Sequence, residues 1–343
     1  MLDEEIKNNI KKCSRCALCV QNCPIYDIKK DENNTSRGLI CKLSGYENNI
    51  LSKDEIKRDL KVCLNCSKCK KNCPSGVDTS YIFAYKNAQF SPSKISQRLL
   101  LFLKLLPVKL LYFFNFFKRK PISKASNIVY FKGCLARAQH KNTFLDSICS
   151  VPDFLCCGLP YITSGDLKNY NKVKKQNIEL IKKSSKVVFD CASCKSAVQD
   201  YPELSQIDKN KLLFFNEILD KKFKLKNDSR YRTVTFHKPC HMSKTDFLNI
   251  ENFLINIQGI KYISLENTEK CCGFGGSYFM FHPVISSLIT LKKVHDIKKI
   301  NPDLILTSCP SCVIGLRFGQ IISGQFKKTL ELRDFIDKEL IEI

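Results

Sequence analysis

Two cysteine runs near the N-terminus share the spacing C-x2-C-x2-C-x3-C followed by proline. They comprise Cys13, Cys16, Cys19 and Cys23, and Cys63, Cys66, Cys69 and Cys73. Thiolates at this spacing hold [4Fe–4S] cubanes, and in two-cluster proteins the fourth cysteine of each run binds the other cluster. The sequence therefore predicts one cubane on Cys13, Cys16, Cys19 and Cys73 and another on Cys63, Cys66, Cys69 and Cys23. A duplicated pattern of this kind disfavours both a disulfide framework and a zinc site.

A second set of ten cysteines occurs in two copies of the order C…CCG…CxxC. The copies contain Cys134, Cys156, Cys157, Cys191 and Cys194, and Cys240, Cys271, Cys272, Cys309 and Cys312. Five thiols at matched positions predict a metal centre in each copy. The glycine after each cysteine pair would let backbone N–H groups approach cluster sulfurs closely. The spacer between the first two cysteines is shorter in the first copy, which leaves open whether Cys134 reaches its site.

The elements that position these cysteines change in character along the chain. Between the two N-terminal runs the pattern predicts helices over 36–43 and 53–62. From about residue 126, short apolar strands alternate with helices, which predicts parallel sheets with crossover helices. The strands are expected at 127–131, 186–190, 233–236, 262–265 and 303–307, and long helices are expected up to 183 and over 283–300. The cysteines then fall at the carboxyl ends of strands, where sites gather in such sheets.

These patterns predict an α+β multidomain protein. A mainly helical module with two [4Fe–4S] clusters precedes two repeated α/β domains with parallel sheets. The expected boundaries are 1–90 for the cluster module, 91–125 for an apolar and basic helical linker, 126–228 for the first repeat and 229–343 for the second.

Composition limits the partners and the compartment. The 343 residues carry a formal charge of +23, but cluster thiolates would reduce it, and the lysines are scattered rather than striped. We therefore do not expect nucleic-acid binding. Lys68, Lys70 and Lys71 lie inside the second cysteine run, where they either raise a cluster potential and steer an acidic partner or form a solvated face. The first seven residues are acidic without an apolar run, so we expect reduced thiols in the cytoplasm.

The segment 98–117 is strongly apolar. Lys104, Pro107 and Lys109 near its centre disfavour a membrane-spanning helix. Two interpretations stay open: a pair of helices packed on protein, or helices lying on the membrane surface. The second would make the protein peripheral on the inner face of the membrane.

Two cysteines outside both sets and two histidines beside Cys240 have further predicted roles. Cys41 and Cys149 are outside both cysteine sets, and their apolar helical contexts predict buried, inert thiols. His237 and His241 flank Cys240 and either tune its cluster, relay a proton or simply pack at a strand end. The sequence contains no recognisable flavin site or phosphate loop.

The C-terminal repeats resemble the cysteine-rich CCG domains of heterodisulfide reductases and of lactate-utilisation iron–sulfur proteins. The whole chain is similar to the iron–sulfur subunit of glycolate oxidase, with the corresponding subunit of anaerobic glycerol-3-phosphate dehydrogenase as a relative. The matching stretches are both N-terminal runs and residues 36–38, 73–77, 237–240 and 271–273. The resemblance implies that one or both repeats bind a noncubane [4Fe–4S] cluster. Glycolate oxidase subunits often have degraded CxxC pairs, whereas both pairs are intact here.

The resemblance implies an iron–sulfur electron-transfer subunit of a flavin-dependent 2-hydroxyacid dehydrogenase of the glycolate or lactate type. Electrons would come from a separate FAD-containing subunit and pass to quinone or another carrier. The alternative is a catalytic subunit of the heterodisulfide-reductase type, which reduces a disulfide or another terminal acceptor at the intact CxxC pairs. A third alternative, a redox sensor or nucleic-acid-binding protein, rests only on the basic charge.

Overall fold

The computed structural model describes residues 2–91, 127–138, 143–152, 155–219, 222–275 and 278–343. The apolar segment 98–117 lies outside the described residues, so both interpretations of it stay predictions. Within the described residues, no helix has the length and apolar character needed to cross a bilayer.

The N-terminal module is built from helices, as the sequence predicted. They are α1 (Leu2–Lys11), α2 (Leu18–Gln21), α3 (Pro24–Lys29), α4 (Ser36–Glu47), α5 (Lys53–Leu60), α6 (Lys68–Lys71) and α7 (Thr79–Phe90), with a 3-10 turn η1 (Glu32–Asn34). Side-chain oxygens of Thr35 and Asp78 accept backbone N–H groups at the starts of α4 and α7. The apolar faces of α1, α4, α5 and α7 bury Ile10, Leu43 and Ile56 in one core. This core fixes the loops that carry both cysteine runs.

The first repeat contains a three-stranded parallel sheet in the order β1-β2-β3. Its strands are β1 (Ile128–Phe131), β2 (Lys186–Phe189) and β3 (Leu212–Phe214). The helices are α9 (Cys134–Ala138), α10 (Phe144–Ile148), α11 (Leu159–Thr163), α12 (Leu167–Lys183), α13 (Ala192–Gln199) and α14 (Gln206–Asn210), with a 3-10 turn η2 (Phe215–Ile218).

The second repeat contains a four-stranded parallel sheet in the order β6-β5-β7-β8. Its strands are β5 (Thr233–His237), β6 (Lys261–Tyr262), β7 (Leu304–Thr307) and β8 (Lys328–Glu331). The helices are α15 (Lys244–Ile255), α16 (Tyr278–Phe281), α17 (Pro283–Ile300), α18 (Pro310–Ile322) and α19 (Leu332–Glu339). A separate antiparallel pair joins β4 (Phe223–Leu225) to β9 (Leu340–Glu342).

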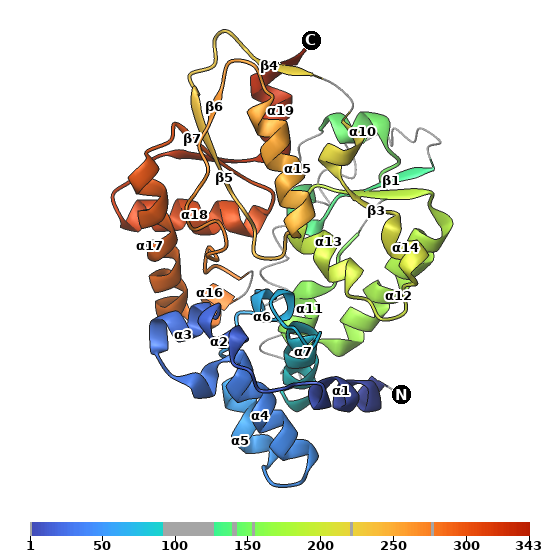
Figure 1. The fold of residues 1–343 in the computed structure, drawn as a ribbon. Helices are drawn as coiled ribbons and strands as arrows, with labels where there is room; N and C mark the ends of the chain where they lie inside the picture. Colours follow the sequence, from blue (N-terminus) through green and yellow to red (C-terminus); the bar gives the residue numbers. More distant parts are fainter. Residues whose placement is uncertain (1, 92–126, 139–142, 153–154, 220–221, 276–277) are drawn as a thin grey trace.

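The two repeats lie side by side, and α6 of the helical module lies close to their junction (Figure 1). One apolar core contains residues of both repeats, such as Phe189 and Phe236. A buried ionic cluster also joins them, because Arg333 of α19 pairs with Asp190, which follows β2. The sheets thus hold the carboxyl ends of their strands in a fixed mutual arrangement.

The parallel sheets that the sequence predicted are present, and the helix over 283–300 has the predicted bounds. The strand expected at 262–265 is shorter and ends at Tyr262. Four strands were not predicted: β3, β4, β8 and β9. Each has only three or four residues, and each forms by pairing with a partner distant in the chain, which a local pattern does not show.

Candidate metal centres

The cysteines of the two N-terminal runs surround two adjoining pockets. The first pocket is lined by Cys13, Cys16, Cys19, Cys69 and Cys73, and the second by Cys23, Cys63, Cys66 and Cys69. Each pocket therefore contains the four thiols expected to hold one cubane. Cys69 lines both pockets, so the two sites share a wall.

The two runs have the same unusual backbone. Arg15 and Ala17 flank Cys16 with φ of 59° and 65°, and Asn65 and Ser67 have φ of 52° and 59° at the matching positions. Such left-handed conformations are uncommon for residues other than glycine and mark constrained functional loops. Each loop is thereby curled so that three thiols face one point.

Donor groups face several of these sulfurs. The backbone N–H groups of Asn65 and Val77 lie 3.4 and 3.3 Å from the sulfurs of Cys63 and Cys73. The Thr79 hydroxyl donates to the Cys69 sulfur at 2.8 Å. Hydrogen bonds to cluster thiolates help to set iron–sulfur potentials. Donors of this kind and soft thiolate ligands fit the [4Fe–4S] clusters that the sequence predicted.

Cysteines of both repeats meet around a single cavity of about 120 Å³. It is lined by Cys134, Cys157, Cys191, Cys194, Cys240, Cys271, Cys272, Cys309 and Cys312. Cys156 adjoins this group, since its side chain is hydrogen-bonded to those of Cys134 and Cys157. All ten cysteines of the second set are thus gathered in one region. The short spacer of the first repeat does not move Cys134 away from the site.

The thiols contact one another in the same order in each repeat. In the first, Cys157 receives hydrogen bonds from Cys156 and then from Cys194, which lower its pKa well below the usual value. In the second, the sulfurs of Cys272 and Cys312 lie 3.3 Å apart. The contacts also cross between the repeats, because hydrogen bonds from Cys191 and then Cys312 lower the pKa of Cys309.

The glycine that follows each cysteine pair has a conformational role. Gly158 and Gly273 have φ of 76° and 79°. A side chain at Gly273 would lie 2.8 Å from the backbone oxygen of Ser286 in α17. The Gly273 N–H lies 3.4 Å from the Cys271 sulfur. The close approach of backbone to sulfur expected from the sequence therefore occurs in the second repeat.

His241 connects all three parts of the protein. One of its ring nitrogens lies 2.8 Å from the Asn65 carbonyl oxygen in the helical module, and the other lies 3.1 Å from the Ser193 hydroxyl in the first repeat. The Ser193 oxygen lies 3.5 Å from the Cys309 sulfur. Burial, reinforced by the charge of Lys71, lowers the pKa of His241. Neither Asn65 nor Ser193 was predicted, because only the fold brings them to His241.

The second cubane site adjoins the second repeat. Burial, followed by the nearby Cys271 thiolate, raises the pKa of Cys66 well above its usual value. A side chain at Gly275 would lie 2.6 Å from the Leu64 side chain, which shows how closely Leu64 packs against the Gly275 backbone. The Tyr278 hydroxyl of the second repeat donates to the Val62 carbonyl at 3.1 Å. The second pocket of the module thus lies directly against the cysteines of the second repeat.

Two of the three lysines of the second run make polar contacts within the chain, and the third is buried. Lys70 lies 2.6 Å from carboxylate oxygens of both Asp78 and Asp200, so it joins the module to the first repeat. Lys71 donates to the backbone oxygens of Cys240 and Met242, each at 2.6 Å. Lys68 is buried. The interpretation as a solvated face is therefore wrong for Lys68 and Lys70, and the acidic partner of Lys70 belongs to the same chain.

Two other sequence predictions have mixed outcomes. Cys149 is buried, as predicted, with 1% of its surface exposed. Cys41 is exposed instead. It lies on α4, whose buried residues Leu39, Ile40 and Leu43 occupy another face of the helix.

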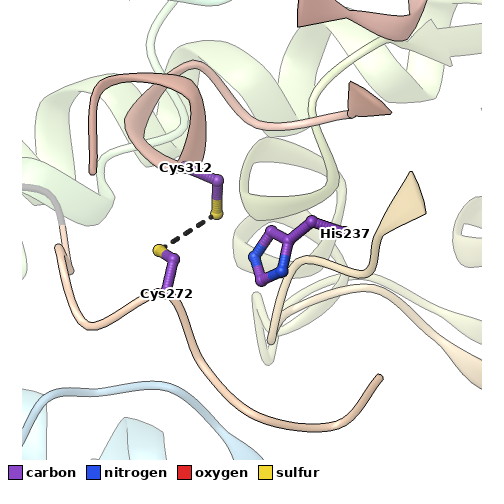
Figure 2. Close-up of side chains that lie close together, drawn as sticks. All are labelled: His237, Cys272 and Cys312. Atoms are coloured by element: carbon purple, nitrogen blue, oxygen red, sulfur yellow. Dashed lines mark hydrogen bonds between the residues drawn. The ribbon is translucent and has the colours of Figure 1, made fainter. Parts of the chain in front are cut away.

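His237 at the end of β5 faces the cysteines of the second repeat. Figure 2 shows its ring beside Cys272 and Cys312, which come from a loop and from α18. Burial, reinforced by the positive charge of Lys293, lowers the pKa of His237 to about 3, so the imidazole is neutral. A neutral imidazole is a suitable metal ligand.

Known protein families account for the cysteine pattern. Residues 9–77 match the 4Fe-4S dicluster domain, and residues 128–199 and 234–317 each match the cysteine-rich domain named CCG. The chain therefore combines an iron–sulfur dicluster domain with two CCG domains. This confirms the resemblance expected from the sequence, with the two CCG domains corresponding to the two α/β repeats.

Curated relatives include proteins of several kinds. An uncharacterised iron–sulfur protein of Methanococcus maripaludis is 32% identical over 168 residues, which are 48% of this chain and 33% of the relative. One subunit of the dihydromethanophenazine:CoB–CoM heterodisulfide reductase of Methanosarcina acetivorans is 29% identical over 63% of this chain and 58% of the relative. Lactate utilization protein A of Lysinibacillus sphaericus is 27% identical over 47% of this chain and 77% of the relative. The chain therefore spans less than two thirds of the first two relatives.

Proposed function

We propose that the chain is the iron–sulfur subunit of a flavin-dependent 2-hydroxyacid dehydrogenase of the glycolate or lactate type. A separate FAD-containing subunit would oxidise the substrate, and quinone or another carrier would take the electrons. The observation that carries this proposal is that the cysteine sites adjoin one another: the two cubane pockets share Cys69, Cys66 lies near Cys271, and the cysteines of both repeats line one cavity. Such a series suits electron transfer between two partners.

The proposed ligands follow the four groups of thiols. One cubane is assigned to Cys13, Cys16, Cys19 and Cys73, and the other to Cys63, Cys66, Cys69 and Cys23. The CCG sites are assigned to Cys134, Cys156, Cys157, Cys191 and Cys194, and to Cys240, Cys271, Cys272, Cys309 and Cys312. When bound, such clusters accept and release single electrons. The protein's contribution is to hold the thiols, supply N–H donors and exclude water.

The partner assignment has its own support. Lactate utilization protein A is among the relatives, and the sequence has no recognisable flavin site, so the hydride acceptor is assigned to another chain. We retain a cytoplasmic location with peripheral contact of residues 98–117 with the membrane as a prediction, together with the absence of nucleic-acid binding.

A second candidate is reduction of a disulfide or another terminal acceptor at the CCG sites. It is favoured by the contact between Cys191 and Cys309, which brings both CxxC pairs to the same cavity. A protein from a heterodisulfide reductase is also among the relatives. Turnover of the reduced chain with quinones but not with disulfides would exclude this candidate.

The ligand assignments can be tested by measuring iron and acid-labile sulfide per chain after strictly anaerobic purification. We expect about 16 irons per chain if all four sites hold four-iron clusters, and about 8 if only the cubanes are loaded. Cys272→Ser and Cys157→Ser form a matched pair, and each should lower the iron content by up to about four with the cubane signals retained. An unchanged iron content in both variants would contradict the CCG assignments.

A kinetic experiment tests the function itself. The purified chain alone should not oxidise glycolate or lactate, whereas it should accept electrons from a reduced FAD-containing dehydrogenase and pass them to a quinone. Oxidation of either hydroxyacid by the isolated chain would overturn the proposal.

A further inference from the structure

The last residues of the strands differ between the two sheets. In the first repeat Phe131, Phe189 and Phe214 pair in register across β1, β2 and β3, and all three are buried. The rings of Phe131 and Phe189 stack with centroids 4.8 Å apart. This row of three aromatic side chains forms an apolar end to the sheet.

The same row in the second repeat is polar. His237, Thr307 and Glu331 pair in register across β5, β7 and β8, and all three are likewise buried. The strand order matches that of the first repeat, so His237 occupies the position of Phe131. The second sheet therefore places an imidazole where the first places a phenyl ring.

Glu331 of this row pairs with Arg333, but several other polar atoms at this end of the sheet have no partner among the described residues. Neither ring nitrogen of His237 has a hydrogen-bond partner among the described residues, and the same is true of the Thr307 and Ser308 hydroxyl oxygens. Burying such a group without a partner is unfavourable, because its hydrogen bonds to water are lost. Orphaned polar atoms in a native interior indicate an ion or another bound group that completes the site.

The geometry around His237 fits a metal ion. A ring nitrogen of His237 and the sulfurs of Cys272 and Cys312 all lie within 4.8 Å of one another. The two sulfurs are 3.3 Å apart. Thiolates bound about 2.3 Å from one tetrahedral metal lie roughly 3.8 Å apart, so small side-chain adjustments would bring all three atoms onto one metal.

We propose that His237 is a nitrogen ligand to the iron atom held by Cys272 and Cys312. The second CCG site would then have mixed sulfur and nitrogen ligation, whereas the first, with Phe131 at the matching position, has thiolates alone. This inference rests on the proposed function, because it requires a cluster in the second repeat.

The nitrogen ligand gives the two CCG sites different potentials. His237 would add a neutral nitrogen donor without displacing a thiolate, so the two sites would differ in their ligand sets and therefore in potential. The buried Lys68 and Lys293 add positive charge near Cys271. The second site, which adjoins the second cubane, would thus be the stronger electron acceptor of the two.

The test uses the full-length chain, loaded with iron anaerobically and containing histidine labelled with heavy nitrogen. Pulsed electron paramagnetic resonance of the CCG signal should show the strong hyperfine coupling of a directly bound nitrogen. His237→Phe, which introduces the residue of the first repeat, should abolish that coupling and shift the midpoint potential of the signal. His237→Cys should also abolish it, with iron retained.

A control variant and the iron content separate failure of the ligand assignment from failure of the proposed function. His295→Phe changes an exposed histidine of α17 and should leave the coupling unchanged. A second site with iron but only weak nitrogen coupling, or strong coupling that survives in His237→Phe, would overturn the ligand assignment and leave the proposed function standing. A second site without iron would overturn the ligand assignment and leave electron transfer to the two cubanes, which the kinetic experiment tests separately. Should His237→Phe fail to fold, the spectrum of the labelled wild-type chain still decides.

Discussion

The two CCG repeats differ in what surrounds the same five cysteines. The first repeat ends its sheet in three stacked or adjacent phenylalanines and meets the helical module through the Lys70–Asp200 ion pair. The second ends its sheet in His237, Thr307 and Glu331. It contacts the second cubane site through Cys66 and Cys271.

The comparison separates what a duplicated fold must keep from what it can change. The cysteine order and the left-handed glycine are the same in both copies, because the thiols must converge on one site. The side chains that end the strands do not need to be the same, and they are aromatic in the first copy and polar in the second. We infer that the second repeat receives electrons from the module directly, and that the first repeat receives them from the second.

Substitution of the glycines that follow the cysteine pairs should have the largest effect on the free energy of unfolding. Gly273→Ala should cost about 3 kcal/mol or more, because the left-handed φ is strained and the methyl group would meet backbone atoms of α17. Gly158→Ala should cost about 2 kcal/mol, since its methyl group meets only side chains of Tyr170 and Val173. Anaerobic urea unfolding of both holoproteins measures the difference. Equal losses would show that the two turns are equally constrained.

The next largest effect is the pH dependence of stability that Glu331 causes. Burial, opposed by Arg333, raises its pKa from 4.5 to about 7, so the folded state binds a proton more tightly than the unfolded state. Its contribution to stability is therefore complete below pH 4.5 and is lost as the pH rises to about 7. The full loss is about 3 kcal/mol.

Glu331→Gln should remove that part of the pH dependence, as measured by the urea midpoint of the holoprotein across this range. The variant at the matching position of the first repeat, Phe214→Leu, should lower stability without changing the pH profile. An identical slope in wild type and Glu331→Gln would contradict the raised pKa.

The smallest effects should come from the lysines that join the module to the repeats. Lys70→Met removes ion pairs whose side chains are 25–30% exposed, so it should cost about 1 kcal/mol. Lys71→Met removes two hydrogen bonds to backbone oxygens beside Cys240 and should have a similar cost, about 1 kcal/mol.

The two lysine variants should differ in their spectra. Lys71→Met should perturb the signal of the second CCG site and slow its reduction through the module, whereas Lys70→Met should leave that signal unchanged. If both variants changed the signal of the second CCG site, the separate roles of Lys70 and Lys71 would be contradicted.

Much of the protein could be predicted from local patterns. The spacing of Cys13, Cys16 and Cys19 specified a curled loop, and the alternation of strands and helices specified parallel sheets. Strand β8 could not be predicted, because Lys328–Glu331 contains two charged residues and becomes a strand only by pairing with β7. Cys41 was wrongly predicted to be buried because its neighbours are apolar. Its exposure depends instead on the face of α4 that it occupies.

The sequence by itself determined the ligand chemistry, since thiolate spacing and glycine conformation are properties of short segments. Only the tertiary structure decided which sites adjoin. Cys191 meets Cys309, Cys66 approaches Cys271, and Lys70 finds Asp200 because sheets and helices far apart in the chain pack together. The polar row at His237 is likewise visible only through strand register, which aligns it with Phe131 of the other repeat.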